Sequence, residues 1–146
     1  MKQEVIAKAA EVIGKARLDG YCVLALIDED GYPTTSAINV AKSDGIRWLV
    51  FGASVDSNKA KRLRKCNCAS VSFSSAQRNI NLVGTVEILT DPKTKQEMWQ
   101  NGWERHWPTG SGDPDLCILR FTTERYAIFF MDDGSEDAGV LPKDGK

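Results

Sequence analysis

The sequence predicts a mainly β protein, a small antiparallel β-barrel with flanking helices. About six segments have the apolar or alternating pattern of strands, and tight Asp-Gly turns join the first of them. Helical spacing is confined to the start of the chain and to a few short segments between strands, an arrangement typical of a barrel with covering helices. With 146 residues the chain is long enough for one domain with a buried core.

The first elements are a helix over residues 2–18 and an antiparallel meander. Apolar residues recur at helical spacing before Gly20, at Val5, Ile6, Ala9, Val12, Ile13 and Ala16. The apolar run 21–27 predicts a buried strand, and Asp30-Gly31 predicts a hairpin turn into a strand over 33–41. A second turn at residues 43–45 leads into a strand over 46–51.

The second half predicts longer strands and two further helices. A helix runs from Ser57 to about Lys65, and strands follow over 69–73 and 79–89, with Gly84 expected to form a bulge. The run Thr90-Asp91-Pro92 predicts the next helix start, with the aspartate or the threonine as cap and the proline in the first turn. Residues 116–121 and 126–131 read as closing strands or as one bent strand. We therefore expect a single domain over 1–131, with the barrel at 21–131, and a loose acidic tail over 132–146.

Composition argues against several functional classes. The net charge of -1 gives no overall attraction to nucleic acid or to an anionic membrane. The start of the chain lacks the apolar core of a signal peptide and no run is long enough to span a bilayer, so a cytoplasmic location with reduced cysteines is expected. Cys66 and Cys68 lack metal-site spacing and His106 is the only histidine, so no metal site is expected. Cys22 and Cys117 lie in apolar runs and are interpreted as buried.

The stretch 51–65, FGASVDSNKAKRLRK, predicts an anion-binding corner. A strand runs through a small turn into a helix whose start leaves backbone N–H groups unpaired. Ser57 would add a hydroxyl and Lys59 a positive charge. A capping serine beside a solvated lysine is the simpler alternative, but a cation in the first turn opposes the helix dipole and is better explained by a bound anion. Nucleic-acid binding by the same basic helix is disfavoured by the near-zero net charge and the lack of interleaved aromatic residues.

No nucleophile–base pair or carboxylate pair stands out, and catalysis by His106 is not expected. A phosphate-binding feature without acid–base groups favours a protein whose cofactor carries the reaction. Five segments in order resemble the pyridoxamine 5′-phosphate oxidase-like flavoproteins, and among them the general stress protein 26 group: GYPTTS (31–36), WLVF (48–51), SNKAKRL (57–63), VGTVE (83–87), and WP (107–108) with GDPDL (112–116). The resemblance spans residues 21–131.

This resemblance implies a six-stranded antiparallel split β-barrel that binds FMN and forms a homodimer with the flavin sites at the interface. Lys59 would pair with the phosphate, Ser57 and Asn58 would hydrogen-bond it, and Asn79 would lie near the flavin. Trp107 would close the pocket from the partner subunit. The remaining contacts would come mainly from backbone at Ser36, Ala37, Ile38, Asn39, Gly52 and Ala53.

Some residues depart from the family pattern. Ser36 replaces a common phosphate-binding arginine, Ala53 replaces a threonine, and Phe129-Phe130 replaces a Tyr-Trp pair. A C-terminal Trp and Arg pair for pyridoxal phosphate is also missing, so vitamin B6 oxidase activity is not expected. The leading hypothesis is an FMN-dependent oxidoreductase acting on an unidentified small molecule. The alternative is a non-enzymatic, stress-related split-barrel protein that binds flavin or another small ligand.

Overall fold

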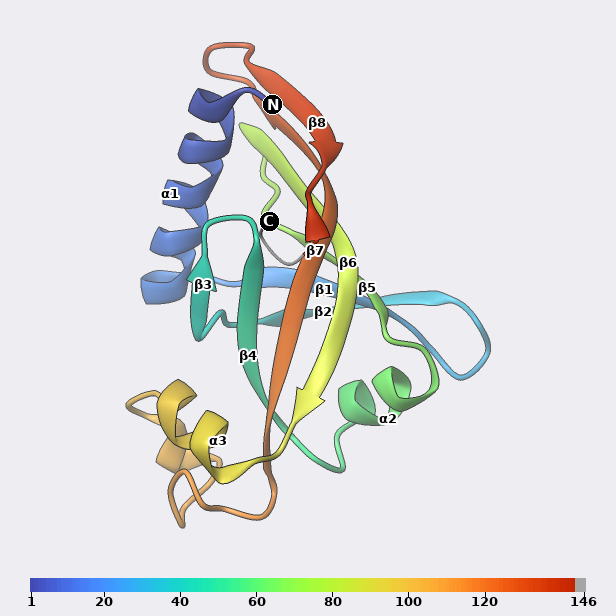
Figure 1. Cartoon of the computed structure of the whole chain (residues 1–146), viewed down its shortest axis with the longest axis vertical. Helices are drawn as coiled ribbons and strands as arrows, with labels where there is room; N and C mark the ends of the chain where they lie inside the picture. The colour runs from blue at the N-terminus through green and yellow to red at the C-terminus, as the bar shows by residue number, and fades with distance from the viewer. Residues whose placement is uncertain (144–146) are drawn as a thin grey trace.

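The computed structural model describes residues 1–143 and consists of one eight-stranded antiparallel sheet with helices around it (Figure 1). The sheet order is β2-β1-β5-β6-β7-β4-β3, and β8 pairs with β7 beside this path. The strands are β1 (Cys22–Ile27), β2 (Pro33–Ile38), β3 (Lys42–Asp44), β4 (Trp48–Ser54), β5 (Cys68–Ser72), β6 (Arg78–Leu89), β7 (Leu116–Phe130) and β8 (Glu136–Val140). The helices are α1 (Gln3–Asp19), α2 (Asn58–Lys65), α3 (Pro92–Met98) and the short 3-10 helix η1 (Trp103–Arg105).

The predicted fold class is confirmed, with eight strands in place of the expected six. Residues 116–130 form one long strand, β7. Of the two predictions for that segment, separate closing strands or a single strand, the single strand is correct. The two added strands are the short β3 and the late β8. None of the described helices is long and apolar enough to cross a membrane.

The acidic tail differs from the loose segment that was expected. Residues 136–140 pair with β7. The hydroxyl of Tyr126 donates a hydrogen bond to the carboxylate of Asp137 at 2.8 Å. Lys8 of α1 pairs with Asp132 at 2.8 Å and lies 4.3 Å from the centre of the Phe130 ring. Composition alone did not reveal these long-range contacts. Residues 144–146 of the predicted tail lie outside the described residues.

Two hydrophobic clusters lie on opposite faces of β4. The larger core contains Leu49, Phe51 and Ala53, together with residues of α1 and the other strands. The smaller cluster contains Val50 from the alternate face and Trp107 from the segment after α3. Cys22 and Cys117 are buried as predicted, and this burial raises the pKa of Cys22 to about 12 and that of Cys117 to about 11.

Gly84 allows β6 and β7 to approach each other at a bulge. The register shifts between Val83 and Gly84, as the isolated glycine predicted. A Cβ at position 84 would lie 1.9 Å from the backbone oxygen of Thr122. Because that atom belongs to a central strand, only glycine fits here without moving the sheet.

Gly84→Ala should lower the free energy of unfolding by about 3 kcal/mol, because the new methyl group displaces a paired backbone. Gly14→Ala is the matched control, since Gly14 is exposed in α1 and a Cβ at position 14 would have no atom within 4 Å. It should raise the free energy of unfolding by about 0.5–1 kcal/mol through helix propensity. Urea denaturation measures both, and equal stabilities of the two variants would contradict the packing role of Gly84.

Candidate functional site

A pocket of about 680 Å³, here called the Gly52 pocket, lies where β4 runs into α2. Its walls come from the residue before β1, the end of β2 and its link to β3, the end of β4, the start of α2, and residues 100–107. Its size is that of a typical small-molecule site. The lining residues are Tyr21, Ala37, Ile38, Asn39, Val40, Ala41, Gly52, Ala53, Ser54, Ser57, Lys59, Gln100, Asn101, Gly102, Trp103, Arg105, His106 and Trp107.

Most of the residues proposed from the sequence come together in this pocket. Those that line it are Ala37, Ile38, Asn39, Gly52, Ala53, Ser57, Lys59 and Trp107. Ser36 and Asn58 are exposed and lie next in the chain to residues of the pocket, but they do not line the pocket themselves. Asn79 lines a separate hollow with Phe129 and Glu136. Trp107, expected to come from a partner subunit, lines the pocket of its own chain because residues 100–107 fold back against β4.

The start of α2 has the local structure that the sequence predicted. Ser57 is the N-cap, and its side-chain oxygen accepts a hydrogen bond from the N–H of Ala60 at 3.2 Å. A hydroxyl that accepts one bond still has its own hydrogen to donate. Ser57 can therefore cap the helix and contact a ligand at the same time.

The basic residues of α2 have different partners. Arg62 pairs with Glu29 at 3.2 Å, and Arg64 donates to the backbone oxygen of Val55 at 2.7 Å. Lys59 is half-buried and is the only lysine or arginine of α2 that lines the pocket. Arg62 and Arg64 therefore hold the helix in place. The remaining lysines of α2, Lys61 and Lys65, are exposed.

The segment carrying Trp103 and Trp107 is held by a buried contact between Lys95 and the loop before β7. The Lys95 ammonium, in α3, donates to the backbone oxygen of Asp113 at 2.7 Å, and both residues are more than nine-tenths buried. The carboxylate of Asp113 accepts from the N–H groups of Asp115 at 2.9 Å and Thr109 at 3.3 Å. These bonds fix the Gly/Pro-rich loop over residues 108–114, which leads into β7.

Three tryptophans pack edge to face in this segment. Trp103 lies 5.8 Å from Trp99 and 5.3 Å from Trp107, between ring centres. Trp107 is only 6% exposed, and its indole Nε1 is buried without a hydrogen-bond partner among the described residues. A buried donor without a partner is destabilising by about 1–3 kcal/mol. Trp107 therefore gives the pocket an apolar wall, and its indole N–H is a buried donor without a partner among the described residues.

The charge of the pocket is wholly positive. Lys59 and Arg105 line it, together with His106, and no aspartate or glutamate is among its lining residues. Such a site attracts anions, since no carboxylate competes for the cations. Arg105 and His106 were not proposed as ligand contacts from the sequence, because nothing local indicated that their turn folds against β4. The spacing of Trp99, Trp103 and Trp107 within nine positions is the signal that could have drawn attention to this segment.

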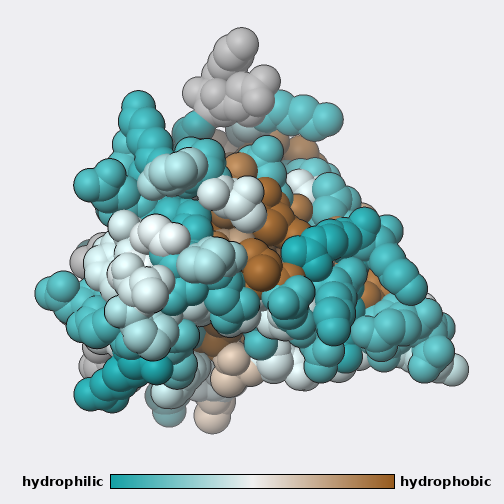
Figure 2. All heavy atoms as spheres, turned by 90° about the horizontal axis from the view of Figure 1, so that it is seen from below, coloured by the Kyte–Doolittle hydropathy of each residue, from teal (hydrophilic) through white to brown (hydrophobic). Residues whose placement is uncertain are grey.

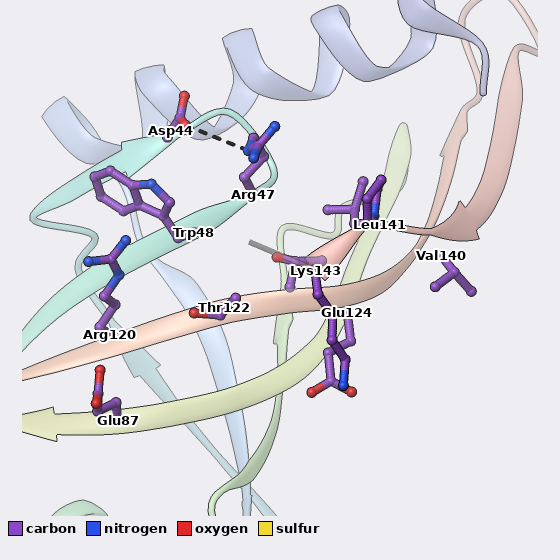
Figure 3. Close-up of a pocket in the computed structure, with 12 residues that line it drawn as sticks. Asp44, Arg47, Trp48, Glu87, Arg120, Thr122, Glu124, Val140, Leu141 and Lys143 are labelled. Atoms are coloured by element: carbon purple, nitrogen blue, oxygen red, sulfur yellow. Dashed lines mark ion pairs between the residues drawn. The ribbon is translucent and has the colours of Figure 1, made fainter. Parts of the chain in front are cut away.

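A second recess of about 660 Å³, here called the Trp48 groove, has a different character (Figure 3). Arg120 lies over the Trp48 ring at 5.0 Å, and Arg47 pairs with Asp44 at 3.9 Å. Its six charged residues balance, three acidic and three basic: Asp44, Glu87, Glu124, Arg47, Arg120 and Lys143. The groove therefore lacks the charge bias that an anionic cofactor requires, and none of the residues proposed from the sequence lines it.

The lower end of the molecule, where α2, α3 and η1 lie, is hydrophilic around a central hollow in which apolar side chains are visible (Figures 1 and 2). An apolar recess with a polar rim is the usual form of a small-molecule site. The fold defines a small barrel protein of the mainly β class, and the Gly52 pocket is its candidate ligand site.

Residues 10–130 match the family model described as pyridoxamine 5′-phosphate oxidase, and the chain belongs to this family. A comparison with curated proteins found no match.

Three solved structures illustrate the shared fold. A Clostridium acetobutylicum protein related to general stress protein 26 is 24% identical with a TM-score of 0.83, and 97% of each chain is covered. General stress protein 26 from Bacillus anthracis is 18% identical with a TM-score of 0.68, covering 90% of this chain and 98% of that one. A pyridoxamine 5′-phosphate oxidase-related, FMN-binding protein from Nostoc punctiforme is 14% identical with a TM-score of 0.69, and 96% of each chain is covered.

The loop before β7, over residues 108–114, should loosen at acidic pH. Hydrogen bonds, first from the Asp115 N–H and also from Thr109, hold the pKa of Asp113 below its ordinary value of 3.8. The carboxylate therefore stabilises the loop above that ordinary value, and its contribution is lost as the pH falls through the lowered pKa. Fluorescence of the neighbouring tryptophans should change in this range, and Asp113→Asn should remove that component. An identical acid transition in the variant would contradict the assignment.

Proposed function

We propose that the protein binds FMN in the Gly52 pocket and acts as a flavin-dependent oxidoreductase on a small molecule. The observation that carries the proposal is a pocket lined by Lys59, Arg105 and a capped helix start, with no acidic residue. Membership of the family and the FMN-binding description of the Nostoc relative support the choice of flavin. A phosphate on a planar, largely apolar cofactor matches both the charge and the tryptophan wall.

In this proposal Lys59 pairs with the phosphate, and Ser57 donates its hydroxyl hydrogen while still capping α2. The backbone at residues 37–39 and 52–53 lines the ribityl chain and the ring. Bound FMN would supply electron or hydride transfer, and the protein would orient the ring and exclude water. Ser36 is exposed on β2 and adds no charge, so Lys59 carries more of the phosphate binding than in relatives with an arginine there.

Binding without catalysis is the second candidate. It is favoured by the absence of any carboxylate among the pocket residues, which leaves few groups to move a proton. Reduction of the bound flavin by a nicotinamide donor and reoxidation by an added acceptor, both in repeated turnover, would distinguish an oxidoreductase from a carrier.

Lys59→Ala should weaken FMN binding by about one to two decades, because a charge-assisted contact to the phosphate is lost. Flavin fluorescence quenching measures the dissociation constant. Lys61→Ala is the matched control, since Lys61 is an exposed lysine on the same helix and does not line the pocket. Riboflavin, which lacks the phosphate, should bind both variants equally. If Lys59→Ala binds FMN as tightly as the unaltered protein, the phosphate lies elsewhere.

We also propose that the protein is a homodimer and that the second copy lies on the outer face of the sheet beside the pocket. One row of register partners crosses six strands on this face with small, uncharged side chains, none of them buried: Ala37, Val23, Ser72, Asn81, Ala127 and Ala138. A row of exposed positions without charge across six strands favours an interface between copies, because charged residues are depleted in the centres of such interfaces.

Two residues link this face to the pocket. Ala37 belongs both to the row and to the pocket lining, so a second copy on the face would border the flavin. Asn79 is exposed on β6, two positions before Asn81 of the row, and its own chain's pocket does not include it. A dimer through this face is therefore the arrangement in which Asn79 would approach the flavin of the partner.

Ala127→Arg should convert the dimer to a monomer, since it places a charge within the uncharged row. Ala7→Arg, on the exposed side of α1, is the matched control and should leave the assembly unchanged. Sedimentation analysis at several concentrations measures the mass. A monomeric unaltered protein, or a dimer that tolerates Ala127→Arg, would contradict this interface.

A further inference from the structure

Trp103 and Gly52 fit together inside the pocket. A Cβ built on Gly52 would lie 2.6 Å and 2.7 Å from two atoms of the six-membered ring of Trp103, and 3.1 Å from a third. Real Cβ atoms do not approach ring carbons so closely. Because Gly52 has no side chain, the Trp103 indole packs directly against its backbone, and this packing position is here called the seat of Trp103.

Trp103 presents the accessible tryptophan surface of the pocket. Two tryptophans line it, and Trp107 is almost completely buried whereas Trp103 is half-buried. Trp99 packs against Trp103 in an edge-to-face contact with an interplanar angle of 83°, and it does not line the pocket. Trp103 is therefore held in place by its contacts with Trp99, Trp107 and Gly52.

The anion-binding and aromatic groups occupy different parts of the pocket. Ser57 and Lys59 belong to the start of α2, and Trp103 belongs to η1. Figure 1 shows α2 and the α3–η1 segment on opposite sides of the lower ends of β4 and β7. A ligand that contacts both groups would place a phosphate beside Lys59 and a ring beside Trp103, and Arg105 of η1 is a second cation among the pocket residues.

We propose that Trp103, seated on Gly52, is the residue that makes this pocket selective for a planar aromatic ring on a phosphate-bearing ligand. The inference rests on the proposed flavin site and adds the side chain that distinguishes ring-containing ligands from simple sugar phosphates. Stacking on a rigid indole favours planar rings, and Lys59 favours the phosphate of any ligand. Recognition of the two ends is therefore separable by mutation.

Three ligands test this separation: FMN, riboflavin and ribose 5-phosphate. Trp103→Leu should weaken FMN and riboflavin about tenfold and leave ribose 5-phosphate unchanged, because only the first two carry the ring. Trp103→Phe should retain most of the affinity, since an aromatic face remains. Lys59→Ala should show the complementary pattern and weaken FMN and ribose 5-phosphate but not riboflavin.

Gly52→Ala tests the seat without removing the indole. The added methyl group must displace Trp103, so FMN and riboflavin affinity should fall as in Trp103→Leu. Gly112→Ala is the matched control, because Gly112 lies in the neighbouring loop and a Cβ at position 112 would have no atom within 4 Å. Thermal unfolding of each variant, without ligand, shows that the comparison is made on folded protein.

The outcomes distinguish this inference from the function on which it rests. If the unaltered protein binds neither FMN nor riboflavin, the flavin site itself is wrong and the inference falls with it. If it binds FMN but Trp103→Leu binds as tightly or more tightly, Trp103 only fills the empty pocket and this inference alone is wrong. Equal losses for ribose 5-phosphate and FMN in Trp103→Leu would also overturn it, since the effect would then not depend on the ring.

Discussion

The long antiparallel pairing of β6 with β7 is the constraint on which the rest of the structure depends. β7 pairs with β6 over nearly its whole length, and its other edge pairs first with β4 and then with β8. The bulge at Gly84 divides the ladder at the point where β7 changes from one outer neighbour to the other. A rigid central ladder of this kind places the end of β4, and with it the pocket, at a fixed position relative to the acidic end of the sheet.

The pocket is assembled from segments that are distant in the chain and tied together by backbone contacts. The N–H of Val55, just after β4, donates to the backbone oxygen of Asp115 at 2.8 Å and joins the turn before α2 to the loop before β7. Lys95 joins the same loop to α3 through Asp113. The start of α2 and the segment that carries the tryptophans are thus both tied to the loop before β7. Such bracing reduces the entropy lost when a ligand binds.

Features encoded by short stretches could be predicted from the sequence, and features created by distant contacts could not. The Ser57 cap, the Gly84 bulge and the Asp91 cap at α3 each follow from a residue type in its local context, and the structure has all three. The approach of residues 100–107 to β4 depends on tertiary folding, so Arg105 was missed and Trp107 was assigned to a partner. The acidic segment of β8 has a composition typical of disorder, but it pairs with β7, and the turn before it is tied to α1 by the ion pair of Lys8 with Asp132.

The contact between Gly52 and Trp103 also has an evolutionary consequence. A side chain at position 52 would displace the tryptophan at position 103 from its present place, because the two would overlap. Replacement of the tryptophan by a smaller residue would first have to open the space, so the order of the two substitutions matters. Related chains should therefore show covariation between these positions, and exchange of a loop between relatives should succeed only when both residues are transferred together.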